Sequence, residues 1–168
     1  MDRFVYAYSF EREDGEVLFR FPKIDRIISG VSEAELAEMS PEKIDEHAHD
    51  AVIEALQTYT AGRESLPEMD DPRFKDADGF VRLTPQEAMK LELYKVYKEN
   101  CQTVGEFANK ISRSATVARR LLDLRYRSAP KEIANAIEVF GKQLVHSWSV
   151  EEASKPVDAS RASSLEYC

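Results

Sequence analysis

The chain has 168 residues, 43% of them hydrophobic, which suffices for one medium domain or two small ones with a buried core. Its seven tyrosines and eight phenylalanines argue against disorder over most of the length. The formal net charge is −8, and the lack of any run of about 18 apolar residues argues against a membrane span.

The first predicted element is a β-hairpin. In the stretch FVYAYSF, one side of a strand would carry Phe4, Tyr6, Tyr8 and Phe10, and the other Val5, Ala7 and Ser9. The Asp-Gly pair in EREDGE is typical of a tight turn, and the second strand, VLFRF, would run to Pro22. We expect a third strand at Arg26–Ser29, before Gly30.

A long helix is predicted after a segment, residues 31–39, whose pattern indicates no definite structure. Ser40 and Pro41 are typical of a helix start, with serine as the N-cap and proline in the first turn. Apolar residues then follow at helical spacing: Ile44, Ala48, Ala51, Val52, Ala55, Leu56 and Tyr59. Gly62 is expected to end this helix, which has one face suited to covering a small sheet.

A linker-like stretch, residues 63–79, and a short strand, GFVRL, precede a segment that is predicted to be all helical. Thr84 and Glu87 form a capping box around Pro85, and Thr103 and Glu106 form a second one. The helix after the second box would bury Phe107, Ala108 and Ile111.

A tight turn at residues 111–113 is followed by Ser114, the expected N-cap of a helix with Val117, Ala118, Leu121 and Leu122 inward. Pro130 would start the last helix, which buries Ile133, Ile137 and Phe140 and ends at Gly141. Residues 146–168 are expected to be a flexible tail.

The charge is unevenly distributed, which indicates two domains with opposite electrostatic partners. Residues 1–79 carry 9 basic and 20 acidic side chains, whereas residues 80–145 carry 12 basic and 7 acidic ones. We therefore predict an acidic amino-terminal domain at 1–79 and a basic domain at 80–145 that attracts nucleic acid.

Two short helices joined by a tight turn match the helix-turn-helix arrangement. In that arrangement Ser114, Ala115, Thr116 and Arg119 would face base edges, while Arg113 and Arg120 would reach phosphates. An ordinary helical bundle with solvated arginines fits the same pattern, and Arg120 is open to pairing with Asp123 or Glu106 instead.

Several motifs in residues 83–144 resemble the carboxy-terminal DNA-binding domain of HicB antitoxins. They are Lys90-x-x-Leu93-Tyr94, Glu106-Phe107-Ala108, Arg120-Leu121-Leu122-Asp123-Leu124 and Phe140-Gly141-Lys142-Gln143-Leu144. The front is similar to the HicB amino-terminal domain in its tyrosine-rich strand, acidic Asp-Gly hairpin, VLFRFP strand and Tyr-x-x-Gly-Arg helix end. The chain departs from the family pattern at Ser112, Arg113 and Val104, and it has about ten extra residues around VSEAELAEM.

The resemblance implies an α+β protein, with a partial ribonuclease-H-like β-β-β-α-β domain followed by an all-α helix-turn-helix domain. It implies an antitoxin that neutralises a HicA-like mRNA-cleaving toxin and represses its own operon as a dimer or higher even oligomer on operator double-stranded DNA. An acidic domain would attract the basic toxin, and a basic one would attract DNA. Glu11, Glu13, Asp14 and Glu16 are the toxin-binding candidates, with a solvated loop as the alternative.

An enzyme and a repressor without a toxin partner are the alternative functions. Ribonuclease H-like catalysis needs three or four carboxylates converging on magnesium, and here the acids cluster in a turn and on helix faces. His47 and His49 lie about 200° apart on a helix, so they cannot share a metal. We therefore expect no enzyme, no metal and no cofactor. A prophage-type or orphan repressor without a HicA partner would have the same DNA-binding half.

The location of the protein is predicted from its cysteines and its amino terminus. Cys101 and Cys168 are its only cysteines, which is too few for a disulfide framework and is typical of a reducing compartment. The sequence MDRFVYAYSFERED lacks the basic start and long apolar stretch of a secretory signal. We expect a cytoplasmic protein.

Overall fold

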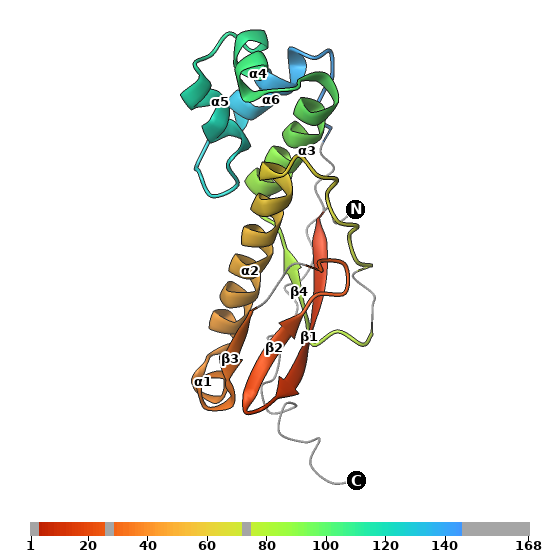
Figure 1. Ribbon diagram of the computed structural model, residues 1–168, viewed down its shortest axis with the longest axis vertical. Helices are drawn as coiled ribbons and strands as arrows, with labels where there is room; N and C mark the ends of the chain where they lie inside the picture. Colours follow the sequence, from red (N-terminus) through yellow and green to blue (C-terminus); the bar gives the residue numbers. More distant parts are fainter. Residues whose placement is uncertain (1–3, 26–28, 72–74, 146–168) are drawn as a thin grey trace. The chain divides into compact units, whose positions relative to one another are not determined.

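The computed structural model describes residues 4–25, 29–71 and 75–145, and these residues form two compact units (Figure 1). Among these residues, the sheet unit consists of 4–25, 29–55, 67–71 and 75–82, and the helical unit consists of 56–66 and 83–145. The fold is therefore mixed α+β, and the units interleave along the chain where the predicted domains were continuous. The predicted tail, residues 146–168, lies outside the described residues.

The sheet has four antiparallel strands in the order β3-β2-β1-β4. They are β1 (Val5–Glu13), β2 (Glu16–Arg20), β3 (Gly30–Ser32) and β4 (Gly79–Arg82). Asp14 and Gly15 join β1 to β2 with φ angles of 51° and 83°, as a type I′ turn requires. The predicted hairpin and the predicted GFVRL strand are both confirmed.

The third strand lies later in the chain than predicted. Residues 26–28 of the expected strand are outside the described residues. Ser29 is not part of a strand, although its carbonyl accepts a hydrogen bond from the Phe19 amide at 2.8 Å. The observed β3 begins at Gly30, where an added Cβ would lie 2.8 Å from Leu18 Cδ2. Gly30 is thus a strand residue at which a side chain would press on Leu18, whereas the sequence pattern predicts that it follows the strand.

The central strand β1 pairs with β4 over its first half and with β2 over its second half. Two aspartates from the segment before β4 complete its hydrogen bonding. The Asp70 carboxylate accepts from the Ala7 amide at 3.0 Å, and the Asp78 carboxylate accepts from the Phe10 amide at 2.7 Å. These two carboxylates therefore stabilise the sheet by accepting hydrogen bonds from backbone amides of β1.

Helix α2 (Pro41–Ala61) covers the tyrosine face of the sheet with residues 41–55 (Figure 1). The Tyr8 hydroxyl donates to Asp45 Oδ1 at 3.3 Å, and the rings of Phe19 and His47 have centroids 4.9 Å apart. Burial is the main reason that the pKa of Tyr8 is raised well above its usual value. A shorter helix, α1 (Glu33–Glu38), fills the segment for which the sequence indicated no structure, and Ser32 is its N-cap.

The start of α2 is confirmed, because the amide of Lys43 donates to Ser40 Oγ at 3.4 Å. Its predicted end at Gly62 is also confirmed, because α2 stops at Ala61, and the left-handed residue that follows is Arg63, with φ 55°. The Glu64 amide donates to the Tyr59 carbonyl at 2.9 Å and the Arg63 amide to Thr60 at 3.2 Å, which is a Schellman motif. The left-handed conformation thus falls one residue after the glycine that ends the helix.

The helical unit contains α3 (Pro85–Asn100), α4 (Val104–Lys110), α5 (Ala115–Leu122) and α6 (Pro130–Glu138). The Thr84–Glu87 capping box is complete, while at the second box Glu106 accepts from the Gln102 amide and not from Thr103. Phe107 is fully buried in the core, which Tyr97, Ala118 and Ile133 share. Among the described residues, no helix is both long and apolar enough to cross a membrane.

Candidate functional site

Helices α4 and α5 meet at a sharp turn that the backbone makes without glycine. Ser112 has a φ of 53°, and the Arg113 amide donates to the Ala108 carbonyl at 2.9 Å. The Ser112 amide donates to Asn109 at 3.1 Å, which completes a Schellman motif. The predicted tight turn is therefore confirmed, and it sends α5 away from α4 immediately after Arg113.

The first turn of α5 presents backbone amides without an acidic neighbour. Ser114 Oγ accepts from the Val117 amide at 3.3 Å, and the first helical backbone bond runs from Ala118 to Ser114. The amides of Ala115 and Thr116 precede that bond, and no acidic residue occupies the first turn. Such a helix start favours a negatively charged group.

The six residues predicted to contact DNA lie together on the outer side of this turn and helix. All six are exposed: Arg113, Ser114, Ala115, Thr116, Arg119 and Arg120. On the opposite side, Ala118 and Leu121 are buried in the core, with 0% and 3% of their surface exposed. The α5 face, as we call these six residues, therefore combines three guanidinium groups with small polar side chains.

Arg120 packs on an aromatic ring and does not pair with either acid considered from the sequence. Its guanidinium carbon lies 4.9 Å from the centroid of the Tyr126 ring, which is a cation–π contact. Glu106 pairs with Lys110 at 3.0 Å, and Asp123 Oδ1 accepts from the Arg125 amide at 3.0 Å. The Tyr126 ring is itself 40% exposed, so this pair extends the α5 face.

Lys90 of α3 anchors the end of α5 from inside, a role that the sequence analysis missed. Its side chain is fully buried, and Nζ donates to three carbonyl oxygens: Arg120 at 2.7 Å, Asp123 at 2.5 Å and Tyr126 at 2.6 Å. Burial lowers the Lys90 pKa to about 8, and the Asp123 carboxylate partly opposes this shift. The ammonium group lies at the negative end of the α5 dipole, where a cation is stabilising.

The end of α2 also supports the loop after α5 and the loop before α4. Gln57 Oε1 accepts from the Leu124 amide at 3.0 Å, and Arg63 Nη2 donates to the Cys101 carbonyl at 2.7 Å. The Tyr94 hydroxyl donates to the Glu64 carbonyl at 2.6 Å. These contacts join residues that are 30 or more positions apart, so no local pattern could have predicted them.

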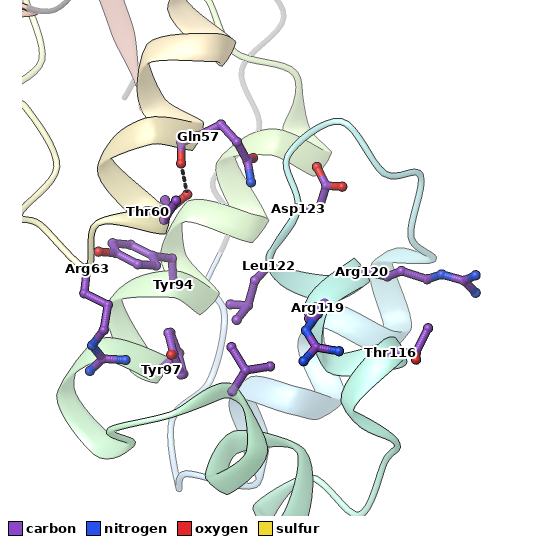
Figure 2. Close-up of a pocket in the computed structure, with 12 residues that line it drawn as sticks. Gln57, Thr60, Arg63, Tyr94, Tyr97, Thr116, Arg119, Arg120, Leu122 and Asp123 are labelled. Atoms are coloured by element: carbon purple, nitrogen blue, oxygen red, sulfur yellow. Dashed lines mark hydrogen bonds between the residues drawn. The ribbon is translucent and has the colours of Figure 1, made fainter.

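An open pocket of about 500 Å³ lies beside α5 within the helical unit (Figure 2). One side consists of Arg63, Tyr94 and Tyr97, and the other includes Leu122, Arg119 and Asp123. In Figure 2 the Arg120 side chain extends away from the other lining residues. Arg119 thus belongs both to the α5 face and to the pocket wall.

The four acids predicted to bind a toxin lie in the sheet unit, at the β1–β2 turn. Glu11, Glu13, Asp14 and Glu16 are all exposed, and Glu13 lies opposite Glu16 in the hairpin. Glu11 pairs with Arg20 across the strands. The acidic turn, as we call these four residues, therefore keeps three carboxylates outside that ion pair.

The histidine and acidic residues of the described chain do not assemble a metal centre. Within residues 4–25, 29–71 and 75–145, no group of three or more histidine, cysteine, aspartate or glutamate side chains is placed to hold an ion. His47 Nε2 instead lies 2.8 Å from Ser29 Oγ. Cys101 is a buried free thiol whose pKa is raised by burial.

No protein-family model matches the sequence, and no curated protein matches it either.

Proposed function

We propose that the protein is a HicB-type antitoxin that binds operator DNA through α5 and a basic toxin through its sheet unit. The observation that carries the DNA half is the α5 face, since all six of its residues are exposed in the turn before α5 or on the side of α5 opposite its buried side. The proposal treats α4, the Ser112 turn and α5 as a helix-turn-helix.

In this proposal α5 enters the major groove with its amino-terminal turn. Thr116 and Arg119 contact base edges, because arginine can donate two hydrogen bonds to a guanine. Arg113 and the amides of Ala115 and Thr116 contact a phosphate. Arg120, held against Tyr126 at 4.9 Å, contacts the next phosphate along the groove.

Repression would require two copies of α5 on one operator. A dimer that binds a palindromic site places its two recognition helices about 34 Å apart, one turn of DNA. The chain offers an apolar surface for such a contact after α6, where Val139 is 53% exposed. A homodimer or a higher even oligomer is therefore part of the proposal.

The toxin half of the proposal uses the acidic turn. A toxin that binds RNA carries a basic surface, and carboxylates on the antitoxin would both attract this surface and compete with RNA for it. Glu13, Asp14 and Glu16 are the contact residues in this account. The proposed partner is a HicA-like mRNA-cleaving protein, encoded beside this chain.

The DNA half is tested by fluorescence anisotropy with duplexes from the region upstream of the gene. Arg119→Ala should weaken specific binding by about 1–3 kcal/mol, the range for one good base contact, while binding to random duplex changes little. Lys95→Ala is the matched control, because Lys95 is an exposed cation on α3 that pairs with Glu92 at 3.3 Å. Equal affinities for wild type and Arg119→Ala at matched salt would show that Arg119 does not read bases.

A further inference from the structure

The pocket beside α5 has an excess of positive charge. The guanidinium groups of Arg63 and Arg119 line it against one acid, Asp123, while the Arg120 side chain extends away (Figure 2). Asp123 Oδ1 already accepts a hydrogen bond from the Arg125 amide at 3.0 Å. A pocket with this lining attracts anions, and its volume of about 500 Å³ is in the range that small-molecule ligands occupy.

Arg63 has two unfavourable features at this wall of the pocket. Its backbone is left-handed, with φ 55°, a conformation that suits glycine better than a residue with a side chain. Its Nη1 is buried and has no hydrogen-bond partner among the described residues. Strained backbone conformations and unsatisfied buried groups are both common at binding sites.

Several of the other lining residues are apolar or already hydrogen-bonded. The Arg63 guanidinium lies 4.8 Å from the centroid of the Tyr97 ring, and Tyr94, Val104 and Leu122 add apolar surface. The Tyr94 hydroxyl and Gln57 Oε1 are both used in bonds within the protein. The pocket therefore offers guanidinium groups for an anionic group and tyrosine faces for a flat apolar body.

We propose that this pocket binds a small organic anion that consists of a flat ring carrying a carboxylate or a phosphate. The anionic group lies between Arg63 and Arg119, and the ring packs against Tyr94, Tyr97 and Leu122. An aromatic carboxylate and a mononucleotide both have this chemistry.

The ligand would also regulate DNA binding, a consequence that rests on the proposed function. Arg119 and Thr116 line the pocket and also belong to the α5 face. A guanidinium group that holds the ligand's anion is no longer available to a base, so ligand and operator compete for Arg119. By linkage, the operator weakens ligand binding by the same factor.

Ligand binding is tested without DNA, on the full chain, by calorimetric titration with benzoate and with adenosine monophosphate. Benzamide and adenosine are the neutral counterparts. At least one anion should bind at a single site with a Kd of about 1 mM or lower, and its neutral counterpart at least about tenfold more weakly. Arg119→Gln and Arg63→Met should each weaken binding about tenfold or more, whereas Lys95→Gln should leave it unchanged.

Arg119 is exposed, so Arg119→Gln decides the matter if Arg63→Met does not fold. The proposal is overturned if neither anion binds saturably, or if Arg119→Gln binds the anion as tightly as wild type. Equal binding of the anion and its neutral counterpart would also overturn it.

The regulatory part is tested by repeating the anisotropy titration with saturating ligand. The operator affinity should fall at least about tenfold in wild type. Unchanged operator affinity with a bound ligand would overturn the coupling and leave the pocket in place. Ligand binding by a chain that binds no specific DNA would instead overturn the proposed function.

Discussion

Lys90 holds the carboxy-terminal end of α5, and with it the α5 face, in place. It satisfies three carbonyl oxygens with one buried ammonium group, so removing it leaves acceptors without their donor. Lys90→Met should lower the free energy of unfolding by about 2–4 kcal/mol in urea titrations. Lys95→Met, on the exposed side of the same helix, should change it by less than about 1 kcal/mol. Similar losses in the two variants would contradict the anchoring role.

The lowered pKa of Lys90 predicts a dependence of stability on pH. Its folded pKa of about 8 lies below the unfolded value of 10.5, so between these two values the unfolded chain binds the proton more tightly. The free energy of unfolding of wild type, relative to Lys90→Met, should therefore rise from pH 8 to pH 10. It should be flat between pH 6 and pH 7.5. A difference that falls with pH above 8 would show that the charged form is favoured by folding.

A local signal for Lys90 was present in the sequence. Lys90 precedes Tyr94 by one helical turn, so it lies on the same buried stripe as Tyr94 and Tyr97. Lysine is rarely fully buried, so the sequence analysis gives Lys90 only as part of the Lys90-x-x-Leu93-Tyr94 motif. The carbonyl groups that it contacts come from residues 30 to 36 positions later, and no sequence spacing indicates that they converge.

Arg113 tests a phosphate contact in the same way that Arg119 tests a base contact. Arg113→Ala should weaken binding to all duplexes by a similar factor and reduce the slope of log affinity against log salt by about 1. The salt titration of random and operator duplexes measures both effects. Loss of affinity for operator alone would reassign Arg113 to base recognition.

At the scale of elements, the turn between α4 and α5 contains avoidable strain. Ser112 is left-handed, and glycine adopts this conformation without a Cβ penalty. Ser112→Gly should raise the free energy of unfolding by about 0.5–1 kcal/mol, whereas Ser112→Ala should not raise it. Thermal unfolding of the three proteins gives the comparison. A gain in Ser112→Ala equal to that in Ser112→Gly would mean that the side chain, and not φ, is responsible.

The strand β4 depends on a glycine that lies against a buried ring. A Cβ on Gly79 would overlap the Tyr8 ring, so Gly79→Ala should destabilise the protein by about 1–3 kcal/mol. In Gly105→Ala the added methyl lies 3.7 Å from Thr103 Oγ1 inside α4, and this variant should gain up to about 1 kcal/mol. Chemical denaturation of both variants tests the pair, and a neutral Gly79→Ala would contradict the close packing.

The elements were predicted well where short-range chemistry defines them and poorly where long-range packing does. The helices that begin after Thr84, Thr103 and Ser114 were predictable, because an N-cap involves only residues within one turn. The strand at Gly30 depends on a residue of another strand, Leu18. A glycine in a sequence can indicate either an unusual backbone conformation or a lack of space for a side chain, and the sequence alone does not distinguish the two.

For the whole molecule, the uneven charge is the basis of the antitoxin proposal. If the acidic turn attracts a basic toxin, Glu13→Gln with Glu16→Gln should slow association several-fold at low salt and less at high salt. Surface plasmon resonance with the neighbouring gene product measures this rate. Glu138→Gln, an exposed acid of α6, is the control. Association rates unchanged at low salt would remove the acidic turn from the interface.

The α5 face as a set of exposed residues was predictable, whereas the pocket beside it was not. Helical spacing separates Ala118 and Leu121 from Arg119 and Thr116, so one side of α5 had to face outward. The pocket needs the end of α2, with Gln57 and Arg63, to lie against α3 and α5. The sequence indicated only that residues 63–79 form a linker, and its first residue turned out to belong to the pocket.

The most direct test of the account is a DNase footprint of the purified full chain on the DNA upstream of its own gene. We predict a protected region with two half-sites whose centres are about 34 Å apart, absent with Arg119→Ala at the same concentration. Protection should persist with Lys95→Ala. If no region is protected at concentrations below those that coat random DNA, or if Arg119→Ala gives the wild-type footprint, α5 does not recognise an operator.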